Sequence, residues 1–328
     1  MVPLLALAAP SAAERVLSLD DYESFDSAQS VGISPDGRTV SYVLDGRIYV
    51  TSAGDDEPRP LTSNESSAWA ARWAADGESI FFLSDRGEST QVFKLSVTEP
   101  GEATQVTQFE NGVASINLSP DESRILLQIS DNQLKPKEED DEPQPFVINR
   151  RHFKRDAGDG YIVDGENEHL YVYEIEEQTL SQLTTGSYEE DSAAWSPDGQ
   201  SVVFVSNREE DPDIGYRTDL WLVSAAGDDS DASLVRLTND DRPKYSPAFS
   251  PDGEEIAFLT AAIGVYVYYH VAVVPVSGGE PRILTTELDR WAGPFLYSSD
   301  GKWIYFSYYE SGARLLARVR VSDAKIET

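Results

Sequence analysis

Six dense apolar runs divide the chain at fairly regular intervals. They lack the alternation of apolar and polar residues that marks a half-exposed strand, so each is predicted to be a strand covered on both faces. The runs are residues 40–44, 80–83, 125–129, 202–205, 256–259 and 303–306.

A turn phrase precedes each apolar run. It reads Ser-Pro-Asp-Gly or a close variant, an order of residues that favours a type I turn. A second phrase, Leu-Thr or Val-Thr, lies 13 residues before the next turn four times and 14 residues before it once. The turns start at Ser34, Ala74, Ser119, Ser196, Ser250 and Ser298, and the second phrase starts at Leu61, Val106, Leu183, Leu237 and Leu284.

The constant spacing predicts the architecture. A third apolar strand follows each covered run, and a short outer strand with Leu-Thr follows that, so each repeat has the order inner, second, third, outer. A period of about 40–50 residues built from short strands is the signature of a β-propeller blade. We therefore predict an all-β fold, a β-propeller over residues 17–328 with six visible repeats. A β-sandwich with coincidental turn phrases is the alternative, and the fixed offset argues against it.

The two ends of the sequence raise separate expectations. The last repeat stops at Thr328, before a Leu-Thr phrase, so we expect its outer strand to be missing. An open ring leaves strand edges exposed. Either residues 17–25 supply the missing strand or the ring continues beyond this sequence, and we expect the second. Residues 3–13 carry the apolar core and small residues of a secretory signal without its positive start, so residues 1–13 predict a partial signal peptide. An apolar N-terminal strand is the alternative.

The third repeat contains an insertion at residues 131–168, between its second and third strands. It begins with an acidic run and continues as a strand-like, locally basic segment that includes Arg150 and Arg151. Long insertions in loops often carry binding functions. A surface hairpin whose charges only face water is an equal alternative.

Composition limits the partners and the compartment. The formal net charge is −32, which excludes nucleic acid as a partner because phosphate binding needs a basic face. The charge also suits solubility in a salty medium, or simply an acidic secreted protein. There is no cysteine, so disulfides and thiolate metal sites are excluded. No stretch has the length of a membrane span, and the expected location is periplasmic or secreted.

The sequence offers no catalytic apparatus. The Gly-x-Ser-x-Gly elbow of a serine hydrolase does not occur. The three histidines, His152, His169 and His270, lack ligand spacing and are expected to be structural. We therefore predict no catalytic, metal-binding or cofactor-binding residue in this chain, and no cofactor.

The repeats and the insertion together resemble the N-terminal propeller of the prolyl oligopeptidase family, in its acylaminoacyl-peptidase and dipeptidyl-peptidase branch. The resemblance rests on the opening from residues 19–22 through the first turn at residues 31–37, on the insertion at residues 146–161, and on the fourth repeat from Trp195 through Ser206-Asn207-Arg208 to Trp221. It implies a seven-bladed propeller that filters peptide substrates for a C-terminal α/β-hydrolase domain. This chain departs from the family pattern because nothing follows its sixth repeat.

The resemblance also suggests where a substrate would be controlled. Propeller acids can hold the free amino end of a peptide, so Glu189 and Glu190 are gating candidates together with Arg150, Arg151 and Arg208. Ordinary surface acids are the alternative for both glutamates. The expected function is a non-catalytic module of a secreted serine peptidase, with peptide substrates reached through the missing domain. The alternative is a free-standing TolB-like periplasmic propeller that binds a protein partner; a propeller enzyme of another type, such as a lactonase or lyase, lacks a recognisable site.

Overall fold

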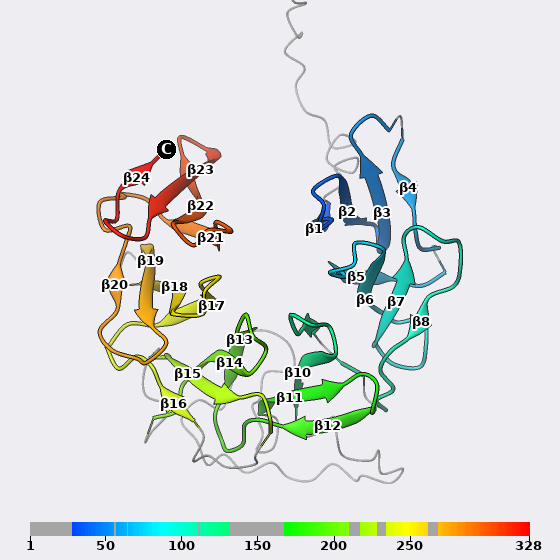
Figure 1. Cartoon of the computed structure of the whole chain (residues 1–328), viewed down its shortest axis with the longest axis horizontal. Coiled ribbons are helices and arrows are strands. Elements are labelled where there is room, and N and C mark those ends of the chain that lie inside the picture. The colour runs from blue at the N-terminus through cyan, green and yellow to red at the C-terminus, as the bar shows by residue number, and fades with distance from the viewer. Residues whose placement is uncertain are drawn as a thin grey trace, which may run out of the picture.

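The computed structural model describes residues 28–328 except 56, 64, 111, 114, 131–166, 210–216, 228–233 and 262–267. The described residues form six antiparallel sheets of four strands each, arranged around an axis as the blades of a propeller (Figure 1). This confirms the predicted fold class and the predicted strand order. Residues 131–167 separate two strands of blade 3, so the predicted insertion at residues 131–168 overlaps the second of these strands at Glu168. Residues 131–166 and residues 1–13 lie outside the described part.

The first three blades occupy residues 29–182. Blade 1 contains β1 (Gln29–Ile33), β2 (Thr39–Leu44), β3 (Arg47–Ser52) and β4 (Arg59–Pro60). Blade 2 contains β5 (Ala68–Trp73), β6 (Ser79–Ser84), β7 (Gln91–Ser96) and β8 (Thr104–Gln105). Blade 3 contains β9 (Asn117–Leu118), β10 (Arg124–Ser130), β11 (Glu168–Glu174) and β12 (Thr179–Gln182).

The last three blades occupy residues 190–327. Blade 4 contains β13 (Glu190–Trp195), β14 (Ser201–Ser206), β15 (Asp219–Ser224) and β16 (Val235–Arg236). Blade 5 contains β17 (Lys244–Phe249), β18 (Glu255–Ala261), β19 (Tyr269–Pro275) and β20 (Arg282–Ile283). Blade 6 contains β21 (Ala292–Tyr297), β22 (Trp303–Glu310), β23 (Ala313–Arg320) and β24 (Ile326–Glu327).

The turn phrase is explained by one repeated hydrogen-bond network. In the first blade the Ser34 hydroxyl donates to Asp36 Oδ1 at 2.6 Å and accepts the backbone N–H of Thr39 at 2.9 Å. The same pair of bonds recurs at the turns of Ser119, Ser196, Ser250 and Ser298. The serine hydroxyl lowers the pKa of each turn aspartate, and at Asp300, where Lys302 adds to the effect, the pKa falls to about 2.

The threonine of the Leu-Thr phrase fixes the outer strand to the third strand. Thr184 Oγ1 accepts the backbone N–H of Leu170 at 2.9 Å, and Thr238 Oγ1 accepts that of Leu220 at 3.0 Å. Equivalent bonds join Thr62 to Ile48, Thr107 to Val92 and Thr285 to Val271. The phrase therefore satisfies a buried donor that the short outer strand leaves unpaired.

Neighbouring blades pack through an apolar cluster at each of five interfaces. At the interface of blades 3 and 4, for example, Trp195 packs with Leu126 and Leu170. The turn phrases of neighbouring blades also pack against each other, the glycine of one turn against the proline of the preceding one. A Cβ added to the glycine would lie 3.5–3.7 Å from that proline, and Gly253 and Pro197 are an example.

Blades 2 and 3 depart from the Pro–Gly contact in a matched way. Ala75 stands in place of the proline and Glu122 in place of the glycine. The backbone N–H of Ala75, which a proline would lack, donates to Glu122 Oε1. Glu122 keeps the left-handed backbone of the glycine it replaces, at a φ of 58°.

The inner strands carry a recurring β-bulge. The pairing register of the inner and second strands shifts within β1, β5, β13, β17 and β21. Four of the bulges place a non-glycine residue in the left-handed region, at Ser30, Ala70, Ser192 and Ser246. Bulges interrupt an exposed strand edge, so these strands face the axis without a continuous edge for pairing.

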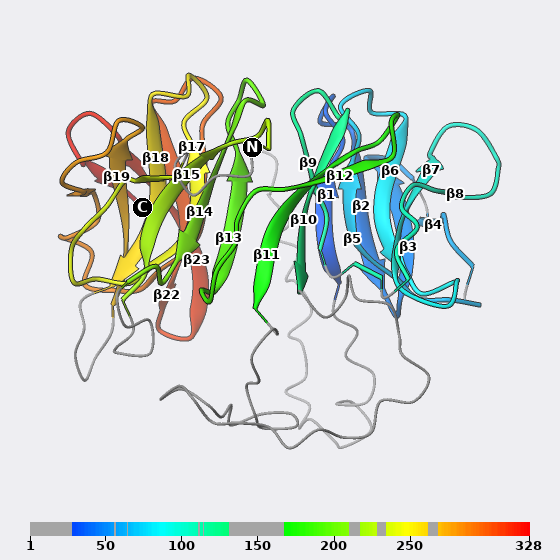
Figure 2. The same cartoon turned by 90° about the horizontal axis from the view of Figure 1, so that it is seen from below.

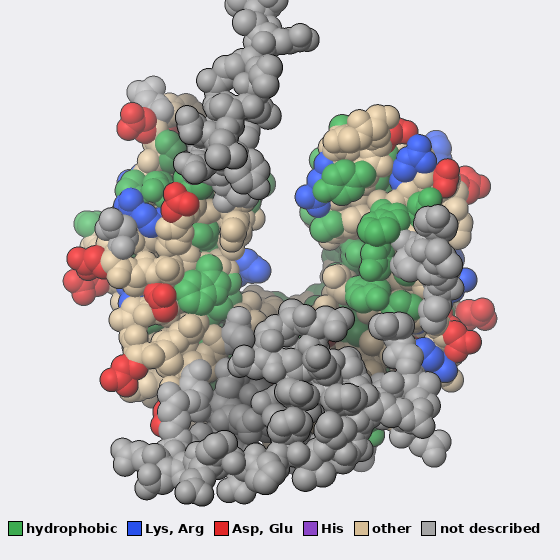
Figure 3. Space-filling model, turned by 180° about the vertical axis from the view of Figure 1, so that it is seen from behind, with side chains coloured by type: hydrophobic (Ala, Val, Ile, Leu, Met, Phe, Trp, Pro, Cys, Tyr) green, Lys and Arg blue, Asp and Glu red, His purple; other side chains and the backbone are tan. Residues whose placement is uncertain are grey.

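The six blades form an open arc, with blade 1 and blade 6 on either side of an opening (Figure 1). Figure 3 shows the two arms standing apart, with hydrophobic side chains on the surface of both. Blade 6 has its outer strand: β24 pairs with β23, although we expected the last repeat to stop before it. The strand was missed because it is two residues long and Thr328 occupies the position of the leucine in the Leu-Thr phrase.

The strands run between two ends of the ring (Figure 2). Turn phrases such as that at Ser196 join the inner and second strands at one end. The second and third strands of each blade are joined at the other, which we call the loop-bearing end. Among the described residues it includes 45–46, 85–90, 207–209, 217–218 and 311–312.

Candidate functional site

A buried ionic cluster joins blades 3 and 4 at the loop-bearing end. Glu190, the first residue of β13, places Oε2 at 2.9 Å from His169 Nδ1 and Oε1 at 2.6 Å from Arg208 Nη2. The three side chains are only 0–6% exposed. Arg208 also donates to the carbonyl of Thr185 at 2.9 Å and lies over the ring of Tyr188, 4.8 Å from its centroid. Both oxygens of Glu190 are therefore engaged inside the interface.

A second ionic cluster joins blades 4 and 5 at the equivalent place. Asp219 Oδ1 accepts the hydroxyl of Thr238 at 2.6 Å and lies 3.8 Å from Lys244 Nζ. Lys244 is fully buried and bonds to Asp240, and Arg236 pairs with Asp219. Lys244 lies six residues before Ser250, just as Glu190 lies six residues before Ser196. Charged residues at this position are thus accommodated only with a buried partner, as the cost of an isolated buried charge requires.

The structure brings two of the predicted site residues together. Glu190 and Arg208 form an ion pair. Glu190 is a buried residue and not a surface acid, because it is the first residue of β13 and lies in the interface between blades 3 and 4. Glu189 is exposed, and its backbone N–H donates to Asn207 Oδ1 at 2.9 Å. Arg150 and Arg151 lie outside the described residues.

Sequence reasoning missed His169 as the partner of Glu190. A signal was available in the repeats: the same position six residues before the turn holds Ala68 in blade 2 and Ala292 in blade 6. A glutamate and a lysine at an otherwise apolar position indicate buried charges with partners in the neighbouring blade. His152 lies outside the described residues, and His270 Nδ1 is 3.0 Å from the carbonyl of Thr285, a structural role.

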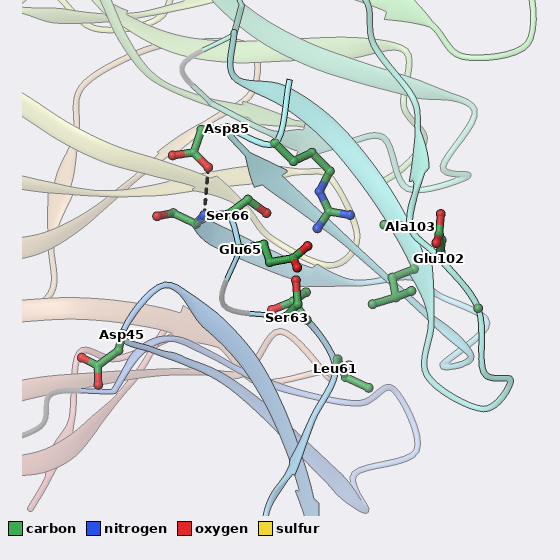
Figure 4. Close-up of a pocket in the computed structure, with 13 residues that line it drawn as sticks. Asp45, Leu61, Ser63, Glu65, Ser66, Asp85, Glu102 and Ala103 are labelled. Carbon is green, nitrogen blue, oxygen red and sulfur yellow. Dashed lines mark hydrogen bonds between the residues drawn. The ribbon is translucent and has the colours of Figure 1, made fainter. Parts of the chain in front are cut away.

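A cavity of about 960 Å³ opens between blades 1 and 2 (Figure 4). Arg86 lines it and stands two residues after the end of β6, the position that Arg208 has after β14. The guanidinium lies 4.7 Å from the centroid of Phe93, and burial lowers the pKa of Arg86. Ala68 occupies the place of Glu190 here, so Arg86 has no acidic partner within salt-bridge distance in the described chain.

The lining of this cavity is mainly polar, and it has four acidic residues against one arginine. Figure 4 shows Glu65 and Ser63 near its centre, Glu102 toward one side and Asp45 toward the other. Asp85 accepts the backbone N–H of Ser67 at 2.8 Å, which fixes the start of β5. A second cavity of about 390 Å³ is lined by residues of blades 2, 3 and 4, including Arg72 of β5 and Asp191 of β13. Both cavities suit binding of polar groups.

The described ranges hold no group of three or more His, Cys, Asp or Glu side chains that could bind a metal ion. They also contain no helix with the length and apolar character needed to cross a membrane.

The architecture and the repeats define a propeller of the TolB type. A family model described as the TolB beta propeller domain (PD40) matches residues 162–325, half of the chain. The chain belongs to this family.

Two curated relatives and one solved structure extend the comparison to peptidases. The uncharacterized peptidase YuxL of Bacillus subtilis is 29% identical over 228 residues, which cover 64% of this chain and 34% of that protein. Dipeptidyl-peptidase 5 of Porphyromonas gingivalis is 23% identical over 345 residues, which cover 93% of this chain and 48% of that protein. The acylaminoacyl peptidase of Pyrococcus horikoshii superposes with a TM-score of 0.63 at 18% identity, over 93% of this chain and 46% of that one.

These comparisons confirm the resemblance to peptidase propellers that the sequence predicted. The chain spans half or less of the length of the curated peptidases it matches. The structural superposition, at low identity, shows the shared fold alone.

Proposed function

We propose that this chain is the non-catalytic propeller module of a serine peptidase and gates the access of peptides to a hydrolase domain of the same protein. The observation that carries the proposal is the extent of the match: 93% of this chain aligns with 48% of a dipeptidyl-peptidase. The part that aligns is a propeller, and its sequence has no Gly-x-Ser-x-Gly elbow.

The gating candidates take different roles in this proposal. Glu190 is buried and paired, so it acts as a positioning residue that fixes the Arg208 side chain at the loop-bearing end. Glu189, which is exposed and directly precedes β13, is the candidate for contact with a peptide's amino group. Arg150 and Arg151 belong to the insertion and remain candidates for contact with the substrate or with the hydrolase domain.

We also propose that a further blade closes the ring to seven. Ile33, directly before the first turn, is 64% exposed, whereas Trp195 at the same position of blade 4 is buried against blade 3. A Cβ on Gly37 would meet nothing within 4 Å, whereas Gly77 lies against Pro35 of its preceding blade. Both features fit a blade that precedes blade 1 in the ring.

The proposed location is the periplasm or the cell exterior, with residues 1–13 as part of a secretory signal. The acidic composition is compatible with either compartment.

A TolB-like scaffold that binds a protein partner is the second candidate function. The family match supports it, since the model that matches half of the chain is named after TolB. In that case the propeller would act without a hydrolase domain.

Labelling with a fluorophosphonate probe tests the first proposal. The 328-residue chain should give no labelled serine and should not hydrolyse aminoacyl or acyl-aminoacyl chromogenic peptides. The protein expressed from the whole reading frame should be labelled at one serine outside these residues. Labelling of a serine within the chain would overturn the module proposal, and a whole reading frame without a reactive serine would favour the TolB-like function.

Gating is tested in the labelled, full-length protein. Arg208→Gln should change the ratio of kcat/KM between short and long peptides while the rate of fluorophosphonate labelling stays the same. Lys325→Gln, at an exposed site in blade 6 away from this interface, is the matched control. An unchanged length preference in Arg208→Gln would contradict the gating role.

A further inference from the structure

Three aromatic rings form a ladder across blades 5 and 6. Tyr245 in β17 meets Tyr269 in β19 edge to face, with centroids 5.4 Å apart, and Tyr269 meets Trp291 in the same way at 5.4 Å. Trp291 directly precedes β21 and is 52% exposed. Inner strands and third strands both begin at the loop-bearing end. The three rings lie at that end, because each belongs to a residue within one residue of the start of such a strand. We call Tyr245, Tyr269 and Trp291 the aromatic ladder.

Other tryptophans of the described chain show how this protein covers an indole face. Above the ring of Trp303, the guanidinium carbon of Arg318 lies 4.1 Å from the ring centroid and that of Arg320 lies 4.8 Å from it. Trp195 carries Arg124 at 4.9 Å, and Trp221 carries Arg236 at 5.7 Å. An arginine of the chain itself thus supplies a cation–π partner in three cases.

Trp291 is half exposed, and within the described ranges no lysine or arginine lies over its ring. Its neighbour Arg290 is directed to carboxylates instead, with Nη1 at 3.4 Å from Asp289 and Nη2 at 3.5 Å from Glu310. The tryptophan with the most accessible ring therefore lacks the cation that three others have.

The charges around the ladder select the ligand. Asp289 is 90% exposed and Glu310 is 48% exposed, and their pairing with Arg290 leaves one net negative charge among the three side chains, on a protein with a formal net charge of −32. This field attracts cations and opposes anions, and the face of an indole ring has a negative potential that favours a cation. The aromatic ladder and the negative charge of the surrounding surface therefore both favour a cationic ligand.

We propose that the aromatic ladder binds a basic peptide segment, with a lysine or arginine side chain over Trp291 and the negative charge of the surrounding surface in its favour. The site goes beyond the proposed gating function, because it requires neither a hydrolase domain nor cleavage of the bound peptide.

Binding of blocked peptides tests the site without involving peptide termini. The probes are Ac-Ala-Arg-Arg-Ala-NH2 and its uncharged counterpart Ac-Ala-Gln-Gln-Ala-NH2, titrated calorimetrically into the 328-residue chain at low salt. The arginine peptide should bind at least about tenfold more tightly than the glutamine peptide and should weaken as salt rises, as expected for exposed charges. Equal affinity for the two peptides, or no binding of either, would overturn the proposal.

Substitutions locate the site. Affinity for the arginine peptide should decrease in the order wild type, Trp291→Phe, Trp291→Leu, since Trp is the best cation–π acceptor and Leu is none. Tyr309→Leu is the matched control, because Tyr309 is another exposed aromatic residue of blade 6 but already carries Arg314 at 5.9 Å. Trp291→Phe keeps a ring against Tyr269 and guards against a folding defect. Unchanged affinity in both Trp291 variants would overturn the assignment.

Discussion

Equivalent positions of the repeat are buried at the five interfaces between neighbouring blades and exposed on the two outer faces of the arc. Val271 in β19 is fully buried against blade 6, whereas Leu316, which has the same place in β23, is 76% exposed. Trp195 is 8% exposed and Ile33, directly before the first turn, is 64% exposed. Both members of each pair are apolar and lie at equivalent positions, so the presence of a neighbouring blade decides whether each residue is buried.

This difference shows where the stability of the arc lies. A propeller blade is too thin to bury both of its faces alone, and a repeat protein is stabilised by nearest-neighbour interfaces. Substitutions at interface positions should therefore be costly, and the same substitutions at the outer faces should be nearly neutral.

An aspartate at matched positions gives the largest contrast. Val271→Asp places a carboxylate without a partner in the interface of blades 5 and 6 and should cost more than about 4 kcal/mol. Leu316→Asp should change the stability by less than about 0.5 kcal/mol. Urea denaturation followed by tryptophan fluorescence measures both, and a similar loss in the two variants would show that Leu316 is covered in solution.

The sequence was sufficient for the architecture because its signals are local. Ser34 and Asp36 bond within one turn, and Thr62 bonds to the adjacent strand of its own blade. Each repeat therefore has the same short phrases at the same spacing, and this spacing was enough to predict the blades. The ionic clusters were not predicted because Glu190 and His169 are 21 residues apart and meet only when blades pack. The aromatic ladder was missed for the same reason, since Trp291 and Tyr269 belong to different blades.

The ionic cluster of blades 3 and 4 gives the next largest effect. Glu190→Gln removes a buried carboxylate and leaves Arg208 and His169 without it, which should cost about 3–5 kcal/mol, the range for breaking a buried ion pair. Glu280→Gln, at an exposed site, should be within about 0.5 kcal/mol of the wild type. Thermal unfolding by circular dichroism measures the two variants, and equal melting temperatures would contradict the buried cluster.

Truncation of the residue before the turn compares an interface with a face directly. Trp195→Ala removes a side chain packed between blades 3 and 4 and should cost about 3–5 kcal/mol. Ile33→Ala should cost less than about 0.5 kcal/mol because its side chain has no neighbouring blade. Denaturation midpoints that shift equally would contradict the comparison.

The departure at blades 2 and 3 gives a smaller effect that a double-mutant cycle resolves. Ala75→Pro removes the N–H that Glu122 accepts, and Glu122→Gly removes the acceptor. The double variant restores the Pro–Gly pair of the other interfaces, so the two changes should be coupled by at least about 0.5 kcal/mol, the double variant being more stable than the sum of the two single changes predicts. Additive free energies would show that these residues do not interact.

The turn of blade 6, beside an outer face, gives the smallest effect and depends on pH. The pKa of Asp300 is lowered to about 2 by the Ser298 hydroxyl and by Lys302, below the value of about 3.9 expected in the unfolded chain. Its contribution to stability is therefore complete above about pH 4 and is lost as the pH falls toward the folded value. The melting temperatures of the wild type and Asp300→Asn should converge below about pH 4, and a constant difference would contradict this linkage.

Hydroxyl-radical footprinting of the folded 328-residue chain, read by mass spectrometry, tests most directly whether its outer faces lack a neighbour. The account predicts that Leu316 and Ile33 are oxidised rapidly, whereas Val271 and Trp195, at the matched interface positions, are protected despite the higher intrinsic reactivity of the indole. Protection of Leu316 and Ile33 equal to that of their counterparts would contradict the open arc and show that the two faces are covered in solution.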